Sequence, residues 1–90
     1  MNLLHDATCG SLESSDVYIV VKPGQEGIQL TIESIVKTQY GKRLEEIARD
    51  VLQRCQVSQA QVFVQDHGAV DFVFRARMET ALARAGEEKQ

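Results

Sequence analysis

The stretch Ile28-Gln-Leu-Thr-Ile-Glu33 decides the fold class, because apolar and polar residues alternate in it without a break. Successive side chains of a β-strand point to opposite faces, so this pattern predicts a half-buried strand. The stretch Asp16–Lys22 has the same period, with an apolar residue at every second position from Val17. Residues 23–27, Pro-Gly-Gln-Glu-Gly, have the composition of a turn. We therefore expect the two strands to form an antiparallel hairpin.

Two later segments have the period of a helix instead. In the first, from Val36 to Cys55, apolar residues recur at steps of three and four, as one buried helix face requires. They are Val36, Tyr40, Leu44, Ile47, Ala48, Val51, Leu52 and Cys55. The second segment runs from about Ala69 to Gly86. Glycine is a residue type that suits the C-terminal end of a helix. The apolar face of this segment consists of Val70, Val73, Phe74, Met78, Ala81, Leu82 and Ala85.

Two further strands complete the expected fold. Ala60–Gln65 alternates again, and Ala7–Leu12 is predicted as a short edge strand that the turn Glu13-Ser14-Ser15-Asp16 joins to the next strand. The order is then β-β-β-α-β-α. The simplest packing is an α+β, two-layer domain in which two helices cover one face of a four-stranded, mostly antiparallel sheet. The 90 residues show no repeat or linker, so we expect a single domain over 1–90, with 86–90 as a frayed tail.

Composition excludes several functional classes. The net charge is −3, without a basic block, and the chain has two tyrosines and three phenylalanines, so we expect no nucleic-acid binding. No stretch approaches the roughly 18 apolar residues of a membrane span. The first ten residues lack the features of a signal peptide, which predicts a cytoplasmic protein with reduced thiols.

The sequence contains no recognisable catalytic or metal-binding constellation. His5 and His67 fall in different loops without an evident carboxylate or cysteine partner, and solvated loop positions are expected for both. Cys9 and Cys55 are far apart and match no metal-ligand spacing, so structural roles are favoured. An enzyme with Ser14 or Cys9 as its nucleophile would lack a base.

The serine turn has two interpretations. Ser and Asp are common in turns because their side chains bind local backbone groups, and this structural reading is favoured when the residues are considered alone. The functional reading needs an exposed, mobile serine beside acidic residues, as an attachment point would be. Glu13-Ser14-Ser15-Asp16 satisfies that description, as many turns do.

The segment Ala7-Thr-Cys-Gly-Ser-Leu-Glu-Ser-Ser-Asp-Val17, of the form G-[ST]-L-E-S-x-D, resembles the N-terminal segment of citrate lyase acyl carrier proteins. The resemblance continues through residues 32–41, Ile-Glu-Ser-Ile-Val-Lys-Thr-Gln-Tyr-Gly. It returns in Asp66-His-Gly-Ala-Val-Asp71, in Arg75-Ala-Arg77 and in Leu82-Ala-Arg-Ala85. It thus covers about residues 7 to 86, in order, and is specific because the strings occur together.

Membership of this family would imply a non-catalytic subunit that carries a covalent prosthetic group. The group is 2'-(5''-phosphoribosyl)-3'-dephospho-CoA, joined to a serine through a phosphodiester, a phosphoserine linkage that makes the chain a phosphoprotein. The family motif places this serine at Ser14, with Ser15 as the neighbour that physics alone does not separate from it. The arm ends in a thiol that carries acetyl and citryl groups as thioesters. The implied partners are the alpha (acyl transferase) and beta (acyl lyase) subunits of a citrate lyase complex and a prosthetic-group transferase.

Four residues are accessory candidates by the same resemblance. Glu13 and Asp16 either help the transferase recognise the serine or solvate and cap the turn, and the second reading is slightly favoured. Arg75 and Arg77, with Arg84 nearby, either form a solvated helix face or contact the phosphates of the arm or an acidic partner. Arg77 is the most notable, because its spacing places it on the otherwise apolar face.

Three rival functions remain open at this point. The chain could be the carrier of a related complex, a citramalate lyase or a malonate decarboxylase. It could also be a regulatory α+β module without a covalent group. Fatty-acid carriers are excluded as a scaffold, since they are four-helix bundles with Asp-Ser-Leu at a helix start, a motif this chain lacks.

Overall fold

The computed structural model describes residues 1–35 and 38–86, without the side chains of residues 38–40. Its elements are β1 (Ala7–Gly10), β2 (Val17–Pro23), β3 (Ile28–Ser34), α1 (Thr38–Arg54), β4 (Ala60–Asp66) and α2 (Asp71–Gly86). The predicted order and the α+β class are confirmed. Two predicted core positions, Val36 and the side chain of Tyr40, and residues 87–90 of the predicted tail lie outside the described residues.

The predicted hairpin between β2 and β3 is wrong. The sheet order is β1-β2-β4-β3, so β4 lies between them, antiparallel to β2 and parallel to β3. Alternation determines which side chains face the core, but it carries no information about which strand lies alongside. The loop after β2 instead reaches the start of β4, where the Ala60 amide donates to the Gly27 carbonyl at 3.0 Å. The hairpin of β1 and β2 is present as predicted.

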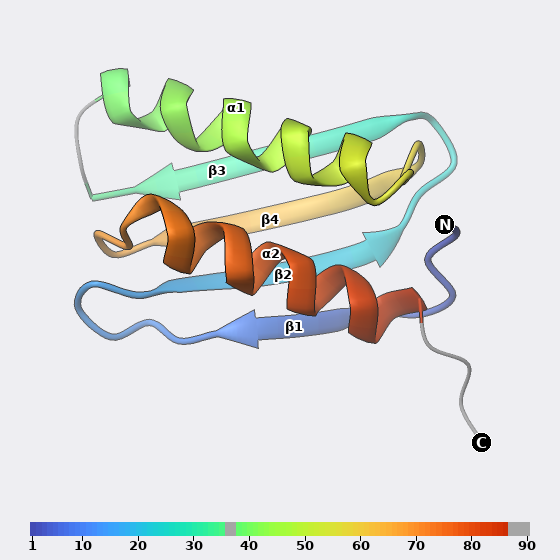
Figure 1. Cartoon of the computed structure of the whole chain (residues 1–90), viewed down its shortest axis with the longest axis horizontal. Helices are drawn as coiled ribbons and strands as arrows, with labels where there is room; N and C mark the ends of the chain where they lie inside the picture. The colour runs from blue at the N-terminus through green and yellow to red at the C-terminus, as the bar shows by residue number, and fades with distance from the viewer. Residues whose placement is uncertain (36–37, 87–90) are drawn as a thin grey trace.

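Both helices cover the same face of the sheet, as predicted (Figure 1). The inward residues of β2, which are Val17, Ile19 and Val21, are fully buried beneath them. The predicted helix faces supply most of the remaining core: Leu44, Ile47, Ala48, Val51, Leu52, Phe74, Met78, Ala81, Leu82 and Ala85. Full burial of each large apolar side chain contributes about 1.5–3 kcal/mol. This single core therefore fixes the sheet against both helices.

Val70 does not belong to this core. The sequence placed it on the buried face of the second helix, but its side chain is 52% exposed. α2 begins one residue later, at Asp71, so the helical period does not yet apply at Val70. Among the described residues, none of the helices combines the length and the hydrophobicity that crossing a membrane requires.

Three connections gather at one end of the molecule. Figure 1 shows the turn between β1 and β2, the end of β3 and the loop between β4 and α2 side by side at the left. This arrangement follows from the topology: the carboxyl ends of β1, β3 and β4 all point to that end. Ser14 belongs to the first of these connections.

Candidate functional site

Ser14 lies at the tip of a four-residue turn. The Asp16 amide donates to the Glu13 carbonyl at 3.2 Å, which closes the turn around Ser14 and Ser15. Ser15, the third residue, has a φ of 65°, the sign that a type II turn requires at this position. The Ser14 side chain is exposed, and its hydroxyl makes no hydrogen bond with any described residue. This oxygen is therefore open to approach from solvent.

The main chain of the turn is bound to the loop that follows β4. The Ser15 amide donates to the His67 carbonyl at 2.7 Å, and the His67 amide donates to the Asp16 carbonyl at 2.9 Å. These two bonds extend the pairing of β2 with β4 into the turn. The turn is thus held in place while the side chain at its tip projects into solvent.

A buried carboxylate organises the loop after β4 in turn. Asp66 is 1% exposed and accepts hydrogen bonds from the Ser34 hydroxyl at 2.9 Å and the Ala69 amide at 3.0 Å. The buried charge therefore has partners from two other segments, as burial of a carboxylate demands. Through this loop, the end of β3 and the serine turn share one hydrogen-bonded support.

Asp16 is the polar centre of the serine turn. Its carboxylate accepts from the Ser11 hydroxyl at 2.7 Å, the Val17 amide at 2.7 Å and two nitrogens of Arg77, each at 3.1 Å. The hydrogen bond from Ser11, followed by those from Val17 and Arg77, lowers the pKa of Asp16 from its ordinary 3.8 to about 2, against the opposing effect of burial. Asp16 therefore remains ionised and ties the turn to α2 at all but strongly acidic pH.

Replacing Asp16 with asparagine should destabilise the fold in a pH-dependent way. The folded-state pKa is lower than the ordinary value, so the stabilisation by Asp16 is complete above about pH 5 and is lost as pH falls through about 2. We expect Asp16→Asn to lower the free energy of unfolding by about 2 kcal/mol at pH 7, the scale of a charged hydrogen bond. Denaturant titrations at pH 7 and pH 2.5 should show that the unfolding free energies of wild type and Asp16→Asn differ less at the lower pH.

The control for this experiment is Glu13→Gln. Glu13 belongs to the same turn, is exposed and forms no ion pair with a described residue. Its replacement should leave the unfolding free energy within about 0.5 kcal/mol at both pH values. An Asp16→Asn penalty that stayed the same at pH 2.5 would contradict an electrostatic role for this carboxylate.

The other two arginines of α2 are also bound within the chain. Arg75 donates to Asp50 of α1 at 2.7 Å, and Arg84 donates to the Thr8 carbonyl of β1 at 2.8 Å. All three arginines thus join α2 to another part of the chain. The sequence contained one indication of such contacts, the position of Arg77 on the apolar helix face, because a charged side chain there needs a partner.

Two residues of the site were not singled out from the sequence. Gly10 has a φ of 94°, and a Cβ there would lie 1.8 Å from the Val17 carbonyl oxygen. Ser11 donates to Asp16, and its oxygen accepts from the Glu13 amide at 3.3 Å. The string G-[ST]-L-E-S-x-D therefore has a structural basis: the glycine permits the close approach, and the hydroxyl and the aspartate hold the turn.

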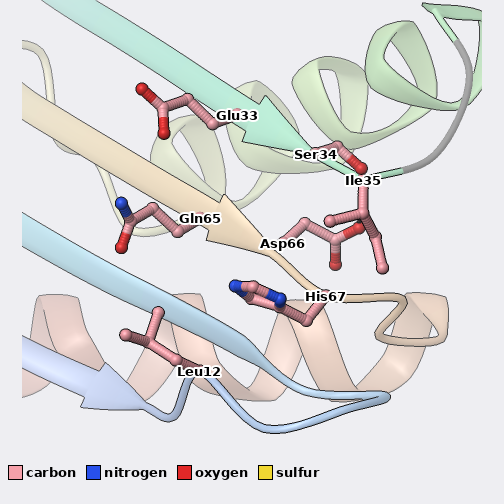
Figure 2. Close-up of a pocket in the computed structure, with 7 residues that line it drawn as sticks. All are labelled: Leu12, Glu33, Ser34, Ile35, Gln65, Asp66 and His67. Carbon is pink, nitrogen blue, oxygen red and sulfur yellow. Dashed lines mark hydrogen bonds between the residues drawn. The ribbon is translucent and has the colours of Figure 1, made fainter.

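A groove of about 450 Å³ lies beside the turn. It is lined by Leu12, Glu33, Ser34, Ile35, Gln65, Asp66 and His67. Figure 2 shows the ring of His67 between Leu12 on one side and Ile35 on the other. His67, expected as a solvated loop residue, is instead half-buried in this wall. Within 1–35 and 38–86, no group of three or more His, Cys, Asp or Glu is arranged to hold a metal ion.

Comparison with known proteins identifies the family of this chain. The citrate lyase acyl carrier protein of Klebsiella pneumoniae is 46% identical over 100% of this chain and 94% of the relative. The chain belongs to the citrate lyase acyl carrier protein family. The protein of the same name from Rhodopseudomonas palustris is 40% identical over 98% of this chain and 91% of its own length.

Relatives of another complex share the fold of this family. Residues 4–85 match the family described as the malonate decarboxylase delta subunit. A chain in the crystal structure of a Pseudomonas malonate decarboxylase hetero-tetramer in complex with malonate superposes with a TM-score of 0.71. It is 22% identical and covers 96% of this chain and 89% of that one, a likeness that establishes the fold alone.

Proposed function

We propose that this chain is the acyl carrier subunit of a citrate lyase complex, with phosphoribosyl-dephospho-CoA attached through a phosphodiester to Ser14. Full-length identity of 46% to a citrate lyase acyl carrier protein supports the class of protein. The observation that carries the attachment site is the exposed Ser14 hydroxyl, at the tip of a turn whose main chain is hydrogen-bonded to the loop after β4.

The residues of the turn fit such a group. A phosphodiester needs a hydroxyl that solvent and a transferase can reach, and Ser14 provides one without losing a hydrogen bond. When bound, the group supplies a terminal thiol that accepts acyl groups as thioesters. The fixed turn sets the origin of the arm, so the tethered acyl group reaches its partners at high effective concentration.

The accessory residues divide by their contacts. Asp16 and Arg77 position the turn, because two nitrogens of Arg77 donate to the Asp16 carboxylate. Glu13 is exposed next to Ser14 and is available for recognition by the prosthetic-group transferase. Arg75 is bound to Asp50, so we assign it a role in holding α1 against α2.

The proposed carrier is not itself catalytic. A nucleophilic serine needs a base within hydrogen-bonding reach, and Ser14 has no such partner among the described residues. Acyl exchange and cleavage of the citryl group would then belong to the alpha and beta subunits. The carrier's contribution is to present one substrate to two sites in turn.

A second candidate is the carrier of a malonate decarboxylase. The family match over residues 4–85 favours it, although the name of the 46% identical relative favours citrate. Purified carrier, loaded with the prosthetic group, can be combined with the catalytic subunits of either complex. Citrate cleavage in the first mixture and no malonate decarboxylation in the second is the expected pair of results.

Mass spectrometry of the protein from its native host tests the attachment directly. We expect an intact mass that exceeds that of the 10.1 kDa chain by one CoA-sized group. After digestion, the added mass should lie on the peptide that contains Ser14, and fragmentation should place it on that residue. An unmodified chain in a host that cleaves citrate would overturn the proposal.

A further inference from the structure

Large apolar side chains are exposed around the serine turn. Within the described residues, three of the seven exposed large hydrophobic side chains lie in the three connections at the Ser14 end, and a fourth lies in the first turn of α2. They are Leu12 (56% exposed), Ile35 (71%), Val70 (52%) and Phe72 (73%), and we call them the apolar rim. The other three are Met1, Leu4 and Phe63.

Contacts between the connections bring the rim residues together. Leu12 and Ile35 line the same groove, with the ring of His67 between them (Figure 2). The loop that leads to Val70 is joined to the serine turn through the two His67 main-chain bonds. Phe72 follows in the first turn of α2, which starts at this end of the molecule. The rim therefore borders the turn that carries Ser14 from two sides.

The fold does not explain this exposure. The first buried residue of α2 is Phe74, so Val70 and Phe72 lie before the buried face of this helix begins. Single exposed apolar residues are ordinary, but several gathered on neighbouring loops are typical of an interaction surface. Aromatic residues such as Phe72 are enriched where protein partners bury surface.

The charged residues near the rim indicate the charge expected on the partner's surface. Asp16 is paired with Arg77, and Asp71 is paired with Arg43 at 2.9 Å. Glu13 follows Leu12 in the chain, and Glu33 lines the same groove as Leu12 and Ile35. Neither glutamate forms an ion pair with any described residue. Two uncompensated carboxylates beside an apolar surface match a partner whose own apolar patch is bordered by cations. A subunit that admits a phosphate-bearing arm needs such cations at its entrance.

We propose that the apolar rim, with Glu13 and Glu33, is the surface through which this chain docks on the catalytic subunits of its complex. This inference rests on the proposed carrier function. Docking through the rim places Ser14 at the entrance of the partner's active site. Glu33 lies where this surface meets the uncovered face of the sheet, because it lines both the groove with Leu12 and Ile35 and a hollow with Phe63.

Binding of the unmodified chain to the separately purified acyl transferase and acyl lyase subunits tests the proposal. Isothermal titration calorimetry would compare wild type with Phe72→Ser and Ile35→Ser. We expect each variant to weaken binding to at least one of the two subunits roughly tenfold or more, as loss of a central aromatic or aliphatic contact does. The control is Leu4→Ser, which replaces an exposed apolar side chain beside the C-terminal end of α2, away from the Ser14 end, and should change binding less than twofold.

Charge reversal provides an independent arm of the test. Glu13→Lys and Glu33→Lys should slow association and reverse its dependence on salt, because like charges then face each other. Circular dichroism and thermal melts establish that every variant is folded, which is expected since the replaced side chains are exposed. Unchanged binding by the folded rim variants, or a loss confined to Leu4→Ser, would overturn the docking surface.

The two proposals fail in different ways. Ser14 lies at the tip, and Ser14→Ala should bind the catalytic subunits with wild-type affinity because no arm is present in this assay. If rim variants bind normally while Ser14 carries the group in the native protein, the docking surface is wrong and the carrier function stands. If Ser14 is unmodified in the native protein while rim variants lose binding, the carrier function is wrong and the docking surface stands.

Discussion

Replacement of Ser14 with alanine should abolish citrate cleavage by the reconstituted complex. The change removes one oxygen from an exposed turn residue that makes no side-chain hydrogen bond with a described residue. Such a substitution should alter the unfolding free energy by less than about 0.5 kcal/mol. The covalent link cannot form without the hydroxyl, so we expect no CoA-sized mass addition and activity at the background of the mixture without carrier.

Ser15→Ala is the matched control for this experiment. Ser15 is exposed as well, but its contribution to the turn is its main chain, whose amide donates to His67. Alanine keeps that amide, so modification and activity should remain close to wild type. A loss of modification in Ser15→Ala with full modification in Ser14→Ala would move the attachment to the neighbouring residue. Full activity in both variants would contradict a serine-linked carrier altogether.

The elements of the fold could be predicted from the sequence because local periodicity reflects burial. The alternation from Val17 and the three-and-four spacing around Leu52 each correspond to one buried face. The position of β4 between β2 and β3 could not be predicted in this way. Strand neighbours depend on how α1 crosses back over the sheet, and that choice is made by packing between segments distant in sequence.

In the candidate site, too, the local features could be predicted from the sequence and the long-range contacts could not. Ser14 could be placed in a turn from composition, and the structure has the turn where it was predicted. The bonds that hold the turn join Asp16 to Arg77, 61 positions later, and Ser15 to His67. No local pattern reports such partners. The exposed position of Val70 was equally hard to predict, because it lies one residue before α2, where the helical period does not yet apply.

The second large effect is expected at Gly10. Alanine there would adopt a φ of 94° and place its Cβ 1.8 Å from the Val17 carbonyl oxygen. The strained backbone costs about 1–2 kcal/mol, and the displacement of β2 adds about 1–3 kcal/mol. We expect Gly10→Ala to lower the unfolding free energy by about 2–5 kcal/mol in total. Thermal melts should show a fall in Tm of roughly 10 °C or more, given the small size of the domain.

Gly27→Ala separates the two causes of this loss. Gly27 also has a positive φ, of 76°, but nothing lies within 4 Å of the added Cβ. It should therefore show the backbone cost alone, about 1 kcal/mol. Equal losses in the two variants would show that the contact with Val17 is unimportant. The Ser11 amide donates to the Val17 carbonyl at 3.1 Å, so its protection from hydrogen exchange reports on this contact. A larger loss of stability in Gly10→Ala, together with weaker protection of this amide, would show that the close approach shapes the serine turn. The glycine of the motif would then be required because it lets the chain pass close to β2 and brings Ser11 to Asp16.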